Sequence, residues 1–202
     1  MKIGIFTPAY REAVHVETAY TLVREVAWCH ERGIVAVPFH RANCTIDQAR
    51  NWALHTAKAQ RLDALLMLDA DCAAPAVLSL LLPRLIDGAA VAALVVQGRD
   101  GRPNLGPHEG EVGTGIMLIN CAAIEWPGPW FRTELTDDGT AVRVGEDIGF
   151  CRQVRAHGRS VDVVEAETHH HGARDFVFSP AAAVTAAPRD GAPHRAVETS
   201  NG

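Results

Sequence analysis

Residues 63–72, DALLMLDADC, decide the fold class that this sequence predicts. Ala64 to Leu68 are uniformly apolar, and Asp69 and Asp71 follow with one residue between them. A short apolar run bounded by polar residues is typical of a strand buried on both faces of a parallel sheet. Alternate side chains point the same way, so the two carboxylates converge at the carboxyl end of the strand, where open α/β sheets bind ligands.

Two converging carboxylates repel each other unless a proton or a cation lies between them. Oxygen-rich sites of this kind suit Mg²⁺ or Mn²⁺, so Asp69 and Asp71 are candidate metal ligands. An acidic turn in solvent is the alternative, and the spacing of the pair does not separate the two interpretations. The surrounding sequence has to decide between them.

Strands and helices alternate on both sides of this stretch. Apolar runs predict strands at 2–6, 34–39, 64–68, 89–96, 114–120 and 160–164, and helical spacing predicts helices at 14–31, 46–59, 75–86 and 145–157. Alternation over the first half implies a parallel sheet with helices on its faces. The prediction is an α/β fold, a single Rossmann-like domain with a mostly parallel central sheet flanked by helices and a small hairpin at 133–144.

Composition limits the class of protein. The chain has 202 residues, 48% of them hydrophobic, and a net charge of −5, which predicts one domain and no general attraction to nucleic acid or anionic membranes. The cysteines lack metal-binding spacing, and no apolar run has the length of a membrane span, so we expect a soluble, cytoplasmic protein. Residues 1–178 form the predicted domain, and residues 179–202, which are poor in large apolar residues, are predicted to be a disordered tail.

Six segments resemble, in order, the motifs of GT-A type nucleotide-diphospho-sugar glycosyltransferases, particularly the family 2-like enzymes. They are TPAY (7–10), IDQARNWAL (46–54), LDADC (68–72), GTGIMLI (113–119), GEDIGFCRQVRAHG (145–158) and HHHG (169–172). The resemblance runs from Lys2 to about Gly172 and implies the GT-A fold and transfer of a sugar from a nucleotide-diphosphate donor. Cys72 stands where the family motif often has a further aspartate.

The resemblance implies donor-binding roles for residues in four of these segments. Residues of the first segment would line the nucleoside pocket, with the tyrosine stacked on the base. The arginine and asparagine of the second would lie near the base and diphosphate, and the glycine-rich start of the fourth would let backbone approach the donor sugar. The donor-binding residues are thus Thr7, Pro8, Tyr10, Arg50, Asn51, Asp69, Gly113, Thr114 and Gly115.

The resemblance also implies a metal site and a catalytic base. Asp71 would bind Mn²⁺ or Mg²⁺ directly, Asp69 would contact the donor ribose or the ion through water, and His170 would complete the metal shell. Three adjacent histidines can rarely reach one tetrahedral ion, so a zinc site made by residues 169–171 is the weaker interpretation. Glu146 and Asp147 resemble the motif whose aspartate deprotonates the acceptor hydroxyl in an inverting transfer.

Alternatives remain at this stage. A nucleotide-sugar-binding module without activity would keep the carboxylate pair, and a sugar nucleotidyltransferase shares the fold, although TPAYRE lacks the GxGxR loop of those enzymes. A UDP-sugar is the favoured donor and the acceptor is open. Nucleic acid is a less favoured acceptor, suggested only by Arg152, Arg155 and Arg159 on one helix. Trp130 and Phe131 suit an acceptor platform or the core, and the glycine-rich stretch 98–113 suits a lid over the donor.

Overall fold

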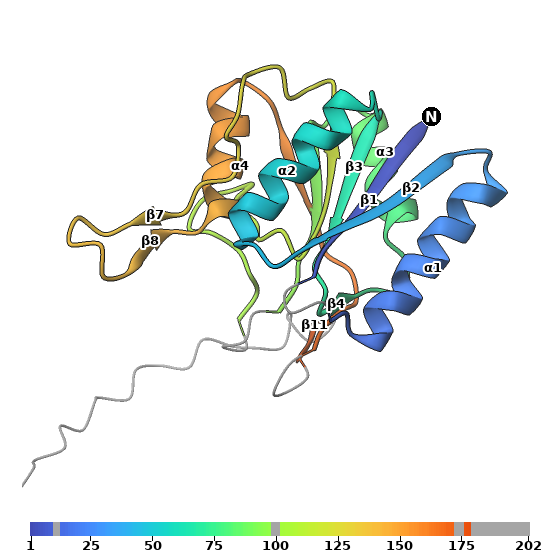
Figure 1. Cartoon of the computed structure of the whole chain (residues 1–202), viewed down its shortest axis with the longest axis horizontal. Helices are drawn as coiled ribbons and strands as arrows, with labels where there is room; N and C mark the ends of the chain where they lie inside the picture. The colour runs from blue at the N-terminus through green and yellow to red at the C-terminus, as the bar shows by residue number, and fades with distance from the viewer. Residues whose placement is uncertain (10–12, 98–101, 172–175, 179–202) are drawn as a thin grey trace, which may run out of the picture.

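A central six-stranded sheet organises the molecule (Figure 1). In this computed structural model the described residues are 1–9, 13–97 and 102–171 and the backbone of 176–178. The strand order is β2-β1-β3-β6-β5-β9, with β1 (Lys2–Ala9), β2 (Val35–Ala42), β3 (Ala64–Leu68), β5 (Val91–Leu94), β6 (Ile116–Asn120) and β9 (Val161–Val164). The pairs β1–β2, β1–β3 and β5–β9 are parallel, whereas β6 runs antiparallel to both its neighbours. The prediction of a mostly parallel α/β fold is confirmed.

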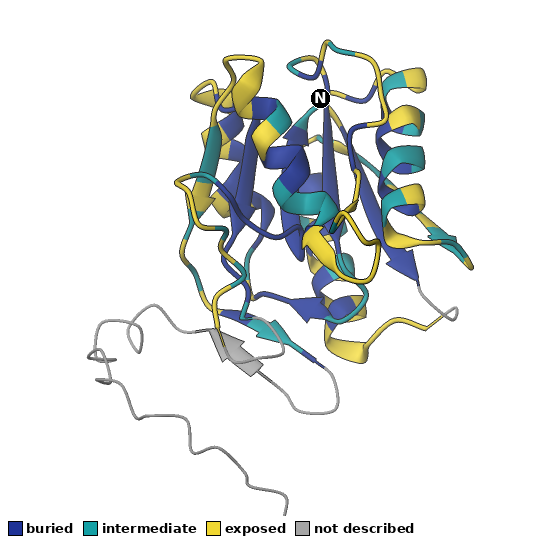
Figure 2. Cartoon of the chain, turned by 90° about the vertical axis from the view of Figure 1, so that its left-hand side faces the viewer, coloured by how far each residue is buried: buried dark blue, intermediate teal, exposed yellow. Residues whose placement is uncertain are grey.

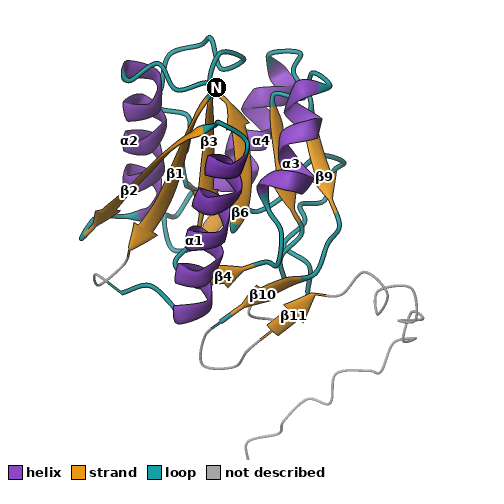
Figure 3. Ribbon diagram, turned by 90° about the vertical axis from the view of Figure 1, so that its right-hand side faces the viewer, coloured by secondary structure: helices purple, strands orange, loops and turns teal. Residues whose placement is uncertain are grey.

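Helices cover both faces of the sheet (Figure 3). Alternate residues of β3 belong to different cores: Leu65 and Met67 pack in one, and Leu66 and Leu68 in the other. The first core is closed by α2 (Ile46–Ala59) and α4 (Glu146–Ala156), and the second by α1 (Val16–Glu31) and α3 (Leu78–Ile86). Colouring by burial accordingly shows dark strands between helices that are buried on one side only (Figure 2).

A second, three-stranded sheet lies at the carboxyl end of the parallel strands. It consists of β4 (Cys72–Ala73), β10 (Thr168–His170) and β11 (Phe176–Phe178), paired antiparallel. Figures 1 and 3 place it at the opposite end of the main sheet from the start of β1. The segment that follows β3 therefore pairs with the segment containing the three histidines, although about a hundred residues separate them.

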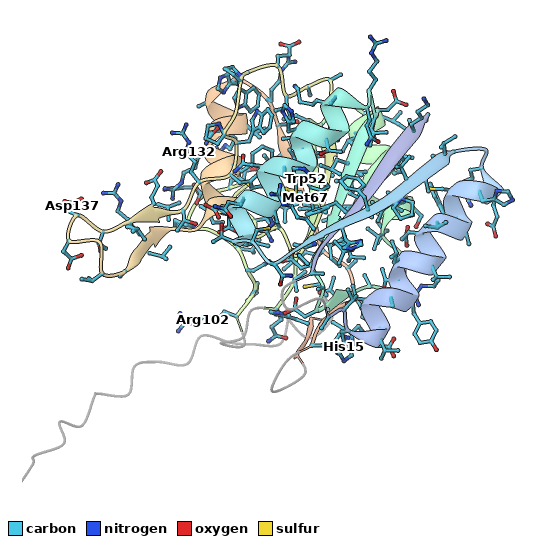
Figure 4. All side chains as sticks on the ribbon, viewed as in Figure 1. His15, Trp52, Met67, Arg102, Arg132 and Asp137 are labelled. Carbon is cyan, nitrogen blue, oxygen red and sulfur yellow. The ribbon has the colours of Figure 1, made fainter. Side chains whose placement is uncertain are left out.

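The predicted hairpin is also present. Its strands are β7 (Glu134–Leu135) and β8 (Val142–Val144), and it projects from the body of the molecule with Asp137 near its tip (Figures 1 and 4). Gly139 turns the chain with a φ of 70°, which glycine adopts without steric cost. Residues 179–202, the predicted tail, lie outside the described residues.

β1 is longer than the sequence predicted. The strand predicted at 2–6 was expected to give way to a turn at residues 7–10, and this is wrong for residues 7–9, because Thr7, Pro8 and Ala9 continue the parallel register with β2. Proline is tolerated there because the pairing of β1 with β3 ends at Phe6, and a strand edge without a partner needs no N–H at that position.

Part of the apolar surface of α1 faces solvent, and several of its polar residues are buried. The helix itself is predicted correctly, yet Val16, Tyr20 and Val23 are 57%, 59% and 65% exposed. The buried positions are Thr18, Thr21, Glu25 and Cys29. Hydrogen bonds explain the burial of the polar residues, since Thr18 Oγ1 donates to Cys72 O at 2.8 Å and the Glu25 carboxylate accepts from the backbone N–H groups that open α3. α1 therefore fastens the segment that follows β3.

None of the helices in the described ranges combines the length and the apolar character that a membrane span requires.

Candidate functional site

Asp71, Cys72 and His170 form a cluster of possible metal ligands at the carboxyl end of β3. One ligand atom from each lies within 4.8 Å of the others. Backbone pairing brings them together, because Cys72 faces His170 across β4 and β10, and the N–H of His171 donates to Asp71 O at 2.7 Å. His170 Nε2 lies 3.3 Å from Asp71 Oδ2. The structure thus selects His170 among the three histidines as the one that faces Asp71.

The orientation of the His170 ring suits a metal ligand. Its Nδ1 lies 2.8 Å from Gln97 O, and a carbonyl oxygen only accepts, so Nδ1 carries a proton. Nε2 then presents a lone pair to the Asp71 carboxylate unless it binds a second proton or a cation lies between the two groups. Histidines that bind metals commonly donate their other N–H to a backbone carbonyl in this way.

The donors fit the ion that the resemblance implies. A carboxylate oxygen and an imidazole nitrogen suit Mn²⁺, whereas Mg²⁺ prefers oxygen ligands alone. Burial raises the pKa of the Cys72 thiol well above its ordinary value, and the charges of Asp69 and Asp71 raise it further. A neutral thiol is a weak ligand, so Asp71 and His170 are the residues that would hold the ion.

Asp69 belongs to a different group, a buried ion network around Arg50. Arg50 Nη2 donates to both carboxylate oxygens of Asp69, at 2.8 and 2.9 Å, and Nη1 pairs with the carboxylate of Glu146. Only 4% of the Arg50 side chain is exposed. The network joins Arg50 on α2 and Asp69 after β3 to Glu146 at the start of α4, which is distant from both in the sequence.

Burial and the mutual attraction of these charges act in opposite directions on the pKa values of the network. Burial disfavours the charged guanidinium, but Asp69 and Glu146 outweigh it, so the pKa of Arg50 is raised above its usual value. Burial raises the pKa of Asp69 and of Glu146, and Arg50 opposes both shifts. Because Arg50 already binds two carboxylates, the contact with donor diphosphate that the resemblance implies stays a prediction, as does a metal-ligand role for Asp69.

Asn51 has a full set of partners within the protein. Its Nδ2 donates to Asp47 O and Phe131 O at 2.8 and 2.7 Å, and its Oδ1 accepts from the N–H groups of Trp130 and Phe131. Trp130 and Phe131 are 6% and 1% exposed, and Phe131 stacks on Phe150 with ring centroids 4.3 Å apart. The two aromatic residues belong to the core, and Asn51 holds their backbone in place.

Asp147 lies next to the glycine-rich start of β6. A Cβ built on Gly113 would come within 3.1 Å of Asp147 Oδ2 and still closer to Asn104, and one on Gly115 would lie 3.1 Å from Cys72 Sγ. Asp69 N donates to Gly115 O at 2.9 Å. Residues 113–115, with Thr114 buried between the two glycines, therefore connect Asp147 to the Asp71 cluster.

The segment before Gly113 is anchored to α4 by an ion pair. Glu111 is 2% exposed and accepts from Arg152 Nε at 2.7 Å, while Arg155 donates to Glu109 O. Arg159 pairs with Glu125 at 3.2 Å, so each arginine of the predicted basic face has a partner within the protein. Residues 98–101 of the predicted lid lie outside the described residues, and closure over a donor stays a prediction.

Replacing Glu111 with glutamine should weaken this anchor. Although burial opposes ionisation, the hydrogen bond and charge of Arg152 lower the pKa of Glu111. A lowered carboxyl pKa stabilises the folded state above the unfolded pKa, and that stability is lost as pH falls through the folded pKa. We expect E111Q to lose about 1–3 kcal/mol at pH 7 in urea unfolding. The difference from wild type should shrink as pH falls below 4.5, the ordinary carboxyl value; a difference that stays constant with pH would contradict the ion pair.

A cavity of about 510 Å³ lies between α1 and the carboxyl halves of β1 and β2. Thr7 lines it and is 5% exposed, and its Oγ1 is buried without a hydrogen-bond partner among the described residues. Thr18 also lines the cavity and donates to Cys72 O, so the cavity adjoins the Asp71 cluster. Pro8 is not among the lining residues, and Tyr10 lies outside the described residues.

The sequence did not reveal two residues of the candidate site. His40 lines the same cavity from the carboxyl end of β2, a position that the strand-end rule could have singled out. Gln97 orients the His170 ring through its backbone carbonyl, which no residue type reveals.

No family model matches the chain, and no curated protein matches its sequence. Among solved structures it is similar to A197 from STIV, with 14% identity over 96% of this chain and 100% of that one and a TM-score of 0.61. What is shared is the fold. The chain also matches a glycosyltransferase involved in the glycosylation of the major capsid of PBCV-1, with 14% identity over 64% of this chain and 70% of that one (TM-score 0.40). A third match is a putative glucose-1-phosphate thymidylyltransferase from Bacillus anthracis, with 11% identity over 84% and 89% of the two chains (TM-score 0.47).

Proposed function

We propose that this protein is a metal-dependent glycosyltransferase that moves a sugar from a nucleotide-diphosphate donor to an acceptor hydroxyl with inversion. The observation that supports this most is the placement of His170 Nε2 3.3 Å from Asp71 Oδ2, at the ligand-binding end of the sheet. The ordered motifs TPAY to HHHG support the same class.

The donor would lie across two neighbouring features. The nucleoside would occupy the cavity between α1, β1 and β2, where the buried Thr7 hydroxyl offers a hydrogen bond that no described residue takes. The diphosphate would then lie beside Asp71 and His170, because Thr18 links the cavity to Cys72. A bound divalent ion would supply charge neutralisation for the departing diphosphate.

Asp147 is the proposed base. Glu146 is held by Arg50, whereas Asp147 Oδ2 faces Gly113 at the start of β6. Asp147 takes the proton of the acceptor hydroxyl, whose oxygen forms a bond to the anomeric carbon. The bond from that carbon to the diphosphate oxygen breaks on the opposite side, and its electron pair leaves with the diphosphate.

Donor hydrolysis tests this proposal directly. Purified protein would be incubated with UDP-, GDP-, TDP- and CMP-sugars in Mn²⁺ and in excess EDTA, and released nucleotide measured. Release that depends on Mn²⁺ and on one nucleotide supports the proposal. Full release in EDTA would overturn the metal dependence. Formation of pyrophosphate from a nucleoside triphosphate and a sugar 1-phosphate would instead identify a nucleotidyltransferase.

Asp147→Asn should separate binding from chemistry. The substitution preserves shape but removes basicity, so transfer should fall by about 10²–10⁴-fold while donor and Mn²⁺ affinities stay unchanged. D137N, at the fully exposed tip of the hairpin, is the matched control and should transfer at the wild-type rate. Near-normal transfer by D147N, or a product that keeps the anomeric configuration of the donor, would show that Asp147 is not the base.

A further inference from the structure

A second cavity lies on the opposite face of the sheet from the Thr7 cavity. Its volume is about 640 Å³, and its walls are the end of β2, the first turns of α2 and the segment 129–133. The cavity is next to α4. Its wall residue Arg132 packs there, since its carbonyl oxygen would lie 3.3 Å from a Cβ built on Gly149, one turn after Glu146.

Two arginines line this cavity without a charge partner. Arg41 and Arg132 both contribute to its walls, and neither has an ion pair with any residue in the described part of the chain. Arg41 is held in place by Trp52, whose ring centre lies 5.1 Å from the guanidinium carbon. Stacking of this kind leaves the edge N–H groups of the guanidinium available for an anion. Figure 4 labels Trp52 on α2 and Arg132.

The acidic residue of the cavity is already engaged. Asp47 lines the wall, but its Oδ1 accepts from the N–H of Gln48 at 2.9 Å and from the hydroxyl of Thr45, at the start of α2. The lining therefore has two positive side chains, Arg41 and Arg132, and one negative side chain, Asp47, which accepts hydrogen bonds at the start of α2. By contrast, the buried Arg50 and the exposed Arg152 each have a carboxylate partner.

We propose that this cavity binds a phosphate monoester of the acceptor substrate, with Arg41 and Arg132 as its hydrogen-bond donors. Paired guanidinium groups suit a doubly charged oxyanion, since each offers a planar fork of N–H donors. Binding of the anion follows from the cavity alone, while its assignment to an acceptor rests on the proposed glycosyl transfer. The phosphate would hold the acceptor beside α4, the helix that carries the proposed base Asp147.

Binding of inorganic phosphate, followed by NMR in EDTA, tests the site without catalysis. The indole N–H signal of Trp52, assigned with W52F, reports on Arg41 directly because the two side chains stack. We expect phosphate to shift this signal in wild type, and R41Q/R132Q to bind phosphate about 10- to 100-fold more weakly. R143Q is the matched control, because Arg143 pairs with Glu134 and Asp137 on the hairpin and does not line the cavity.

Each result has a defined meaning. No shift of Trp52 in wild type, or equal phosphate affinity in the double variant, would overturn the site. Equal affinity for acetate at the same ionic strength would overturn the assignment to phosphate.

A transfer assay tests the acceptor role. With the active donor, a sugar phosphate should be a better acceptor than the matching free sugar, and R41Q/R132Q should raise its KM without changing donor hydrolysis. Equal use of the two sugars would overturn the acceptor role. The wild-type protein could also bind phosphate but turn over no donor. If R41Q/R132Q then loses phosphate binding, the anion site stands and the proposed transfer is refuted.

Discussion

Asp71→Asn is expected to abolish donor turnover and leave the fold intact. The amide keeps the size of the side chain but removes the charge that faces His170 Nε2 at 3.3 Å. Mn²⁺ affinity should fall by at least about 100-fold, since even a lost partner behind a metal ligand costs about 10- to 100-fold. Isothermal titration of Mn²⁺ and the donor hydrolysis assay measure the two effects.

His169→Gln is the control for this experiment. His169 is on the same strand as His170, but its Nε2 lies 3.2 Å from Glu167 and its side chain is 36% exposed. H169Q should bind Mn²⁺ and turn over donor like wild type. Wild-type turnover by D71N, with an unchanged requirement for Mn²⁺, would exclude Asp71 as the ligand.

Arg50→Leu should be the most destabilising single substitution near the site. It leaves the carboxylates of Asp69 and Glu146, whose side chains are 24% and 14% exposed, without their shared cation. Loss of one partner of a buried ion pair costs about 3–5 kcal/mol, and the partial exposure of both acids favours about 3. Urea unfolding at pH 7.5 measures the loss.

The loss should depend on pH. The folded pKa values of Asp69 and Glu146 are raised above 3.8 and 4.5, and removing Arg50 raises them further. In the window above those reference values the folded state then binds more protons than the unfolded state, so the stability of the variant decreases as pH rises. The deficit should therefore be smaller at pH 5 than at pH 7.5.

Arg143→Leu provides the comparison. The Arg143 side chain is 57% exposed, so its ion pairs should contribute only about 0–1 kcal/mol to the stability of the fold. A deficit in R50L as small as that of R143L would mean that the buried network does not stabilise the fold, and a large deficit independent of pH would mean that it does not act through the carboxylate charges.

Local pattern predicted most of the fold. The five apolar residues of β3 are all buried, and α2 begins after Thr45 and spans Ile46 to Ala59 as its capping pattern indicates. Periodicity predicted α1 but not all of its buried face: Val16, Tyr20 and Val23 face solvent, while Leu22, Val26 and Cys29 pack on the core. Its buried threonines and glutamate bind backbone groups of residues 72–78, and such long-range hydrogen bonds leave no periodic signal in the sequence.

The site was predictable where a motif carries the chemistry. The resemblance of HHHG to a family pattern pointed to His170, and the structure places its Nε2 3.3 Å from Asp71 Oδ2; metal binding there stays a prediction. Motifs did not reveal that Asp69 and Glu146 share Arg50, because that network depends on how three separate elements pack. Nor did they indicate that Trp130 and Phe131 are core residues, since large aromatic side chains suit both roles.

The direction of β6 has a mechanical consequence. The residues that follow β3 and those that precede β6 form the two sides of the candidate site, and the two strands are joined by a continuous antiparallel ladder from Leu68–Ile116 to Ala64–Asn120. A hinge between the two halves of the molecule would have to break this ladder. A ligand of the candidate site would therefore enter and leave by movements of side chains and flanking loops, without a hinge in the sheet.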